Sequence, residues 1–333
     1  MRVLLGLVTL LAVIWAGYWA LAARGLETGL SRWVEARRAE GWAADYAGLA
    51  VTGFPARFDT AFTGLSLADP ETGLAWSAPH FAFTAASHRP QAITAIWPPS
   101  QQIATPREKI AVNAALMQGR LEFRPGPALA LIGADYRFED LRLTSTAGWM
   151  AAAGRADLTS AAVEGQADVQ MIDLQAQAMR PPARLLARLD RAGVLPDVFD
   201  RLAMRATLSF DAPWDRRAVE DRRPQITRLD LDSLDAKWGD LELRAAGTLE
   251  VDAQGLPQGT LTLRATNWRE MVEIARASGQ LPAGVADNLT RALAFLAGRS
   301  GRPETLDIPL RFAGGSTWLG PVPVGPAPDF TIR

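Results

Sequence analysis

The chain has 333 residues, with 35 basic and 36 acidic side chains and a net charge of −1, so it lacks the basic excess that nucleic-acid binding requires. It contains no Cys and only two His, which excludes disulfides, thiolate nucleophiles and Cys-ligated metal sites. A hydrophobic content of 48% is ample for a buried core.

Residues 1–24 predict a membrane-spanning helix. No charged residue occurs between Val3 and Ala23, and a helix of that length spans the roughly 30 Å hydrocarbon core of a bilayer. Trp15 and Trp19 lie near its far end, where aromatic rings favour the interface. With Arg2 at the cytoplasmic end, we expect a single-pass inner-membrane protein whose body lies in the periplasm.

The same segment also fits a cleaved signal peptide, because Ala20-Leu21-Ala22 matches the small-x-small cleavage pattern. Its apolar run is longer than the roughly 7–15 residues of a signal sequence, which favours an uncleaved signal anchor. Both alternatives place the body outside the cytoplasm.

Residues 25–42 predict an amphipathic juxtamembrane helix, since Leu26, Leu30, Trp33 and Val34 recur at helical spacing. This helix either continues the anchor and packs on the body or lies on the membrane surface.

Beyond residue 42 the hydrophobic period changes from 3.6 to 2, which predicts β-strands in an N-terminal part, 43–178, and a C-terminal part, 179–333. The clearest strand is 241–251, and turn residues separate it from 257–263, so the two predict a hairpin. The expected fold class is mainly β (α+β): an elongated, curved antiparallel meander with a few helical insertions.

The helical insertions are expected at 180–202 and 268–298. In the first, Pro181 and Pro182 open one helix and Pro196 starts a short second helix that ends at Leu202. In the second, Asn267 caps one helix, and another carries Val285, Leu289, Leu293 and Leu296 on its apolar side.

Four helices, each about 10 Å wide, cover about eight strands spaced about 4.8 Å apart. The sequence predicts more strands than this, so part of the sheet has no helix to cover it. The remaining apolar face either packs on another sheet, as in sandwiches and barrels, or lines an open groove. Its candidate residues are Leu208, Phe210, Leu241, Leu243, Leu249, Val251, Leu261, Leu263, Ile308, Leu310 and Phe312.

Three motifs occur in order after the apolar segment: Val51-Thr-Gly-Phe-Pro-Ala-Arg57, Thr262-Leu-Arg-Ala-Thr-Asn-Trp268 and Leu319-Gly-Pro-Val-Pro-Val-Gly-Pro-Ala-Pro328. Together they resemble a Gram-negative family, domain of unknown function number 2125, over nearly the whole chain. The resemblance implies an exported, membrane-anchored protein and supplies no catalytic residues. The motif residues are Gly53, Phe54, Pro55, Arg57, Asn267, Trp268, Gly320, Pro321, Gly325 and Pro328.

The strand, Asp-x-x-Gly turn, strand and Asn of residues 249–267 are also similar to segments of the AsmA-like envelope proteins. That resemblance implies an inner-membrane anchor and an association with phospholipid passage across the periplasm.

Motifs of enzyme chemistry are absent from the sequence, which has no Gly-x-Ser-x-Gly elbow, P-loop or Gly-x-Gly-x-x-Gly. The densest acidic run, Asp230, Asp232, Asp235 and Asp240, alternates with leucines and is typical of the wet face of a strand. We therefore expect no catalytic, metal or cofactor site, with an envelope hydrolase that uses two paired carboxylates as a minor alternative.

The sequence favours a protein that binds lipid or another hydrophobic envelope ligand through an apolar sheet face, without catalysis. The alternative is an envelope assembly scaffold that docks protein partners by strand addition. The expected partners are the inner membrane, a phospholipid or other hydrophobic ligand, and envelope proteins.

Overall fold

The computed structural model describes residues 1–190, 193, 195–279, 283–299 and 304–332. The chain forms two compact units, each of which is described separately below. Unit 1 comprises Met1–Phe123 and Asp140–Gly148, and unit 2 comprises Arg124–Glu139 and Trp149–Arg333. The expected division between residues 178 and 179 therefore falls inside unit 2.

Unit 1 combines one long helix with antiparallel strands. The central strand β3 pairs with β1, β2 and β4, and β4 pairs in turn with β5 and β6. Its elements are α1 (Arg2–Ala39), β1 (Ala43–Asp45), β2 (Gly48–Thr52), β3 (Arg57–Ala68), β4 (Ala75–Ala86), β5 (Arg89–Ile96), β6 (Ser100–Ala104), β7 (Lys109–Asn113), β8 (Leu116–Phe123) and the end of β9 (Leu131–Ser145).

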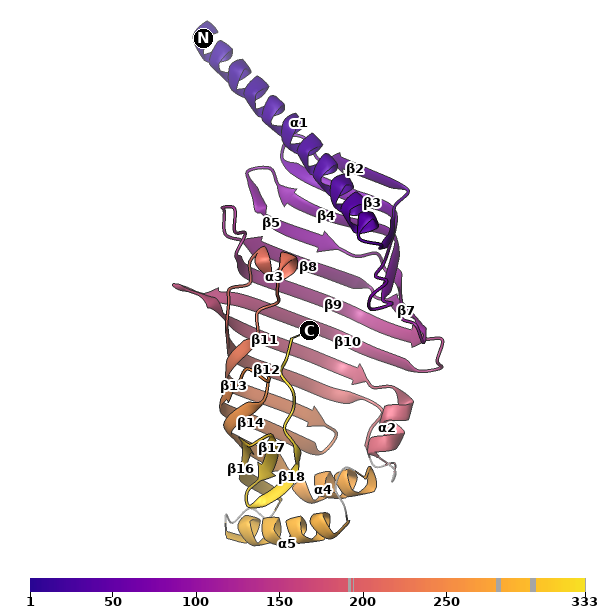
Figure 1. Ribbon diagram of the computed structural model, residues 1–333, viewed down its shortest axis with the longest axis vertical. Coiled ribbons are helices and arrows are strands. Elements are labelled where there is room, and N and C mark those ends of the chain that lie inside the picture. Colours follow the sequence, from indigo (N-terminus) through magenta and orange to yellow (C-terminus); the bar gives the residue numbers. More distant parts are fainter. Residues whose placement is uncertain (191–192, 194, 280–282, 300–303, 333) are drawn as a thin grey trace. The chain divides into compact units, whose positions relative to one another are not determined.

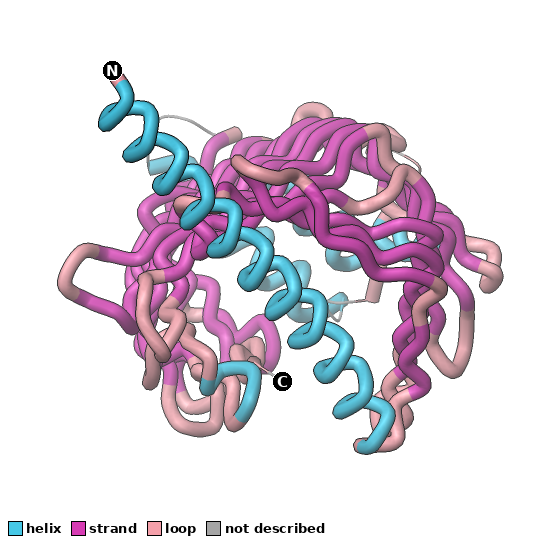
Figure 2. The backbone as a smooth tube through the Cα atoms, turned by 90° about the horizontal axis from the view of Figure 1, so that it is seen from above, coloured by secondary structure: helices cyan, strands magenta, loops and turns pink. Residues whose placement is uncertain are grey.

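The helix α1 is continuous over residues 2–39 (Figure 2). It is long and apolar enough to cross a membrane. The predicted juxtamembrane helix is its second half, which packs on β1 and β2, and Val34 is fully buried there. Of the two alternatives for residues 25–42, the structure therefore has the continuation that packs on the body.

Unit 2 is a ladder of antiparallel strands that pair in chain order (Figure 1). Its elements are the first part of β9, β10 (Met150–Val163), β11 (Gln166–Arg180), α2 (Ala183–Leu189), β12 (Phe199–Phe210), α3 (Arg217–Glu220), β13 (Ile226–Trp238), β14 (Leu241–Val251), β15 (Pro257–Thr266), α4 (Trp268–Ala277), α5 (Ala283–Arg299), β16 (Thr305–Ala313), β17 (Ser316–Leu319) and β18 (Val322–Pro326). The predicted mainly antiparallel β class is confirmed.

The predicted hairpin forms from β14 and β15, which pair from Glu242 opposite Thr266 to Val251 opposite Pro257. Its turn is closed by the Asp252 carboxylate, which accepts hydrogen bonds from the backbone N–H groups of Gln254 and Leu256, both at 2.9 Å. A short acidic side chain stabilises such a turn by bonding the backbone that follows it.

The insertions differ from prediction at 180–202. A helix forms at Ala183–Leu189. The prediction of a second helix from Pro196 to Leu202 is wrong, because the strand β12 begins at Phe199. Strand pairing outweighs local helical preference there, since β12 is bonded to β11 on one side and β13 on the other.

Two helices form where 268–298 predicted them, α4 and α5. The side chains of Val285 and Leu296, assigned to the apolar side of the second helix, lie outside the described residues.

The hydrophobic core of unit 2 has two clusters. One joins α4 and α5 to β15 and β16 and includes Trp268 and Leu293, each 2% exposed. The other joins β12 to β16 through Ala206, Leu231 and Leu249.

Replacing Leu249 by Ala should lower the free energy of unfolding by about 2–5 kcal/mol, because this side chain is 1% exposed and the substitution leaves a cavity. Urea unfolding of the full chain in detergent, followed by circular dichroism, measures the change. Met171→Ala is the matched control in the same unit, because Met171 is 51% exposed. Equal losses for the two variants would contradict the placement of Leu249 in the core.

Candidate functional site

One face of the unit 2 sheet is apolar because the strand register aligns leucines from strand to strand. Residues directly opposite in an antiparallel pair project to the same face. One row of opposed residues crosses seven strands, from β10 to β16. We call this set the apolar row: Leu158, Leu174, Met204, Leu234, Ala245, Leu263 and Ile308.

The apolar residues predicted from the sequence lie on β12 and β14–β16, on the same face as the apolar row. On this face Leu208 lies opposite Leu229, and Leu229 lies opposite Leu249. Most are already covered by the protein itself. Those buried are Phe210, Leu241, Leu249, Val251, Leu261, Ile308 and Phe312. Those partly exposed are Leu208, Leu243, Leu263 and Leu310.

Two helices cover the end of the row nearest the C-terminus. The helix α4 packs on β14 and α5 on β16. Trp268, Leu289 and Leu293 bury Ile308 to 3% exposure. This part of the face is therefore an ordinary helix-on-sheet core.

The C-terminal segment also covers part of the face. After β18 it runs back across the strands (Figure 1), and Ala327 and Phe330 pack against the cluster that contains Leu249. The amide of Gln225 holds its end through two bonds with the Ile332 backbone: the side-chain N–H donates to the carbonyl at 2.9 Å, and the backbone N–H donates to Oε1 at 3.0 Å.

The row remains open from β10 to β13. Leu158, Leu174, Met204 and Leu234 are all partly exposed, and Met204 and Leu234 also pack with one side against the cluster that contains Leu249. Among the described residues, neither core cluster includes a residue of β9–β11. Within the described part of unit 2, a dry sandwich core, the first alternative from the sequence, is therefore not formed over β10 and β11.

Most of this open stretch lies outside the face predicted from the sequence. The apolar side of β11 carries Ile172, Leu174 and Ala176, and Met171 lies on the opposite face. Residues 164–165 form the turn between β10 and β11. The alternation of Ile172, Leu174 and Ala176 with Met171, Asp173 and Gln175 is the signal that could have found it.

Aromatic side chains flank the open stretch at both ends of its strands. At one end Phe210 contacts Trp214 edge-to-face at 5.6 Å, and the Trp214 carbonyl accepts a hydrogen bond from the Leu131 N–H at 2.7 Å. At the other end Phe199 contacts Trp238 at 5.2 Å, and Trp238 Nε1 donates to the Pro196 carbonyl at 2.8 Å.

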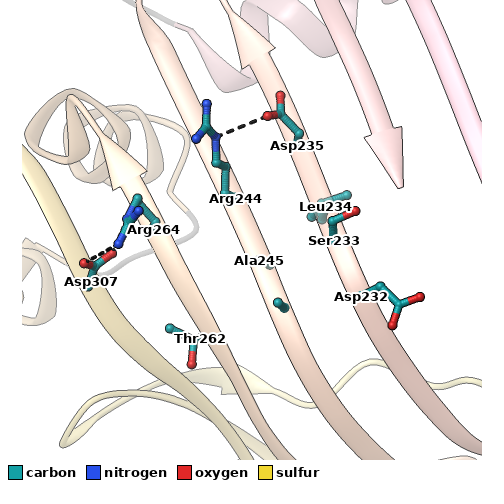
Figure 3. Close-up of a pocket in the computed structure, with 10 residues that line it drawn as sticks. Asp232, Ser233, Leu234, Asp235, Arg244, Ala245, Thr262, Arg264 and Asp307 are labelled. Atoms are coloured by element: carbon teal, nitrogen blue, oxygen red, sulfur yellow. Dashed lines mark hydrogen bonds and ion pairs between the residues drawn. The ribbon is translucent and has the colours of Figure 1, made fainter. Parts of the chain in front are cut away.

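The opposite face of the same strands is polar. Arg244 bonds Asp235 at 3.2 Å and Arg264 bonds Asp307 at 2.6 Å in a shallow groove of about 590 Å³ (Figure 3). Asp232 and Ser233, at a bulge in β13 between Leu231 and Leu234, also line this groove. Because the charges alternate in sign, the groove offers no uniform attraction to a charged ligand.

Five aspartates of this sheet form ion pairs with arginines: Asp157, Asp173, Asp230, Asp235 and Asp307. Hydrogen bonds from the Arg228 and Arg205 guanidinium groups lower the pKa values of Asp230 and Asp173, respectively. Arg155 lowers the pKa of Asp157 in the same way. Among the described residues, no cluster of three acidic or His side chains could hold a metal ion.

The first motif forms the tip of the loop between β2 and β3. Gly53 has a φ of +96°, and a Cβ there would lie 2.9 Å from the Arg57 carbonyl oxygen, so only glycine fits. Phe54 is 56% exposed and contacts Trp19 edge-to-face at 5.4 Å.

The remaining motif residues belong to unit 2. Asn267 stands at the N-cap position of α4 but makes no side-chain capping bond; its side-chain N–H instead donates to the Asp240 carbonyl at 2.7 Å. Trp268 is buried in the cluster that α4 and α5 share. Gly320 and Pro321 form the turn from β17 to β18, Gly325 lies in β18, and Pro328 follows it. The motifs therefore shape loops and caps at separate places and do not converge on one site.

The family described as "uncharacterized protein conserved in bacteria", domain of unknown function 2125, matches residues 19–328, and the chain belongs to it. No curated protein matches the chain. No solved structure matches it either.

Replacing Asp230 by Asn should lower the free energy of unfolding at neutral pH by about 1 kcal/mol, a modest loss because both partners of the Arg228 pair are partly exposed. The pKa of Asp230 is lowered in the folded state, so its contribution is present above the unfolded pKa and is lost as the pH falls through the folded value. The deficit should therefore shrink below about pH 4.

Urea titrations at several pH values test this prediction. Asp232→Asn, on the exposed bulge of the same strand, is the control. A deficit that stays constant with pH would show that Asp230 does not act through its charge.

Proposed function

We propose that this protein is a single-pass inner-membrane protein whose periplasmic body binds lipid or another hydrophobic envelope ligand without catalysing a reaction. The observation that carries the proposal is the open stretch of the apolar row, Leu158 to Leu234, which the rest of unit 2 leaves partly exposed. Contiguous exposed apolar surface on a folded protein marks a binding site.

The size of the open stretch suits one acyl chain. Four strands spaced about 4.8 Å apart make a row of about 14 Å. One acyl chain fills one leaflet, which is half of the roughly 30 Å hydrocarbon core, or about 15 Å. A lipid chain lying across β10–β13 would contact the row along its length.

The borders of the open stretch along the strand direction suit an amphipathic ligand. Trp214 and Trp238 lie beyond opposite ends of the strands, to either side of a chain that lies across β10–β13, and each presents an apolar ring next to backbone polar groups, which is the surrounding that an amphipathic molecule prefers. The polar groove on the other face has paired charges of both signs and fits such a ligand less well.

The contacts of α1 support a retained anchor. Trp15 and Trp19 donate hydrogen bonds to the carbonyl groups of Pro55 and Arg57 at 3.0 and 2.8 Å. Cleavage after Ala22 would remove both donors, and Tyr18 as well, from unit 1.

A charge on the row should abolish ligand binding. Leu174→Glu places a carboxylate among apolar side chains, whereas Met171→Glu places one on the opposite face of the same strand. We expect native mass spectrometry of the full chain, solubilised in mild detergent from its own host, to detect bound lipid on the wild type and on Met171→Glu. Leu174→Glu should retain at most about a tenth as much.

A wild-type protein that carries no lipid would refute the proposal, as would equal lipid on the two variants. Recovery of a stoichiometric protein partner without lipid would instead favour the scaffold that docks partners by strand addition. Circular dichroism of Leu174→Glu establishes that it is folded.

A further inference from the structure

The membrane-spanning helix α1 contacts the strands and loops of unit 1 well before the apolar segment of the helix ends. The hydroxyl of Tyr18 donates to the Ser87 carbonyl at 2.9 Å. Trp19 stacks on Phe58 with ring centres 5.7 Å apart, and Phe58 is 5% exposed. With the bonds from Trp15 and Trp19, these contacts fix the tip of the β2–β3 loop against the helix.

The free part of the helix is too short to cross the bilayer alone. From Val3 to Trp15 the helix rises about 18 Å, and to Trp19 about 24 Å. The hydrocarbon core is about 30 Å thick. If the helix slid outward until Trp15 reached the far boundary, the charged side chain of Arg2 would be drawn into hydrocarbon, which is strongly unfavourable.

We propose that Gly53–Arg57 and the neighbouring turn at Ser87–His88 form a membrane lip, immersed in the interfacial region of the leaflet opposite the N-terminus. The partner of this surface is the lipid bilayer. The inference rests on the spanning anchor in the proposed function, and it does not depend on a ligand on the apolar row.

The backbone of the membrane lip is suited to that depth, where few water molecules can satisfy polar groups. The Pro55 carbonyl accepts bonds from Trp15 and from the Ser87 hydroxyl. The Gly53 carbonyl accepts from the N–H groups of residues 56 and 57, and the Ala56 carbonyl from that of Ser87. These polar groups are therefore satisfied within the protein.

The side chains of the membrane lip match an interface as well. Phe54 is 56% exposed and uncharged. Arg57 is 64% exposed and forms an ion pair with Asp59 at 3.2 Å, and its long side chain allows it to exchange this exposed partner for a headgroup phosphate. An exposed aromatic ring next to a snorkelling basic side chain is the composition that the bilayer interface favours.

Single cysteines test the immersion directly, because the chain has none of its own. Phe54→Cys, His88→Cys, Leu7→Cys and Leu74→Cys would each be labelled with a polarity-sensitive fluorophore in the full chain. The labelled proteins would be reconstituted in phosphatidylethanolamine–phosphatidylglycerol vesicles. Quenching would be measured with aqueous iodide and with nitroxides placed near the headgroup or deep on the acyl chain.

Leu74 is the matched control: it is 50% exposed in the β3–β4 turn, about 40 Å along the hairpin from the lip. We expect labels at positions 54 and 88 to be quenched by the shallow nitroxide and to be at least about threefold less accessible to iodide than the label at 74. The label at Leu7 should respond to the deep nitroxide and reports whether α1 is inserted.

If iodide quenched the labels at 54 and 88 as strongly as the label at 74, while the deep nitroxide quenched the label at 7, the membrane lip would be refuted and the anchor would be retained. A label at Leu7 that is open to iodide would overturn both the anchor and the lip. The use of two lip positions guards against local damage from losing the Phe54 ring.

Discussion

The register of the antiparallel ladder is the constraint on which unit 2 depends. Because side chains alternate between faces, a slip of one residue in any strand would place arginines in the apolar row and leucines in the polar groove. Glycine–leucine pairs help to fix the register of β14 and β15: Gly247 lies opposite Leu261, and Gly259 opposite Leu249. At both glycines a Cβ would lie 2.5 Å from a carbonyl oxygen of the neighbouring strand, so no larger residue fits.

The same register separates the two faces into different chemistries. On the polar face, Arg244 lies opposite Asp235 on one neighbouring strand and Arg264 opposite Asp307 on another, so each arginine meets a carboxylate across a strand pair. On the apolar face, coverage decides which residues belong to the core and which stay partly exposed. The helices α4 and α5 and the C-terminal segment supply that coverage at β14–β16, and the cluster of Leu249 extends through Leu231 and Ala206 to β13 and β12; among the described residues, neither cluster reaches β10 or β11.

The sequence could predict the fold class, the apolar helix and the β14–β15 hairpin, because each rests on local periodicity and turn chemistry. It could not predict that Phe312 and Leu249 are covered, since Phe330 reaches them from a segment without regular structure. The helix expected to end at Leu202 failed because strand partners distant in sequence determine that segment. The open stretch was missed because Ala156, Ser160 and Ala162 dilute the alternation of β10, so that Leu158 stands almost alone there.

The attachment of Ile332 to Gln225 bears on how the protein can be handled. The last described residues lie against the sheet, and the side-chain amide of Gln225 binds them as a neighbouring strand would. An affinity tag at the C-terminal end would therefore lie close in sequence to the two hydrogen bonds between Gln225 and Ile332 and could disturb them. Fusions at the amino terminus, ahead of Arg2, would leave this closure untouched.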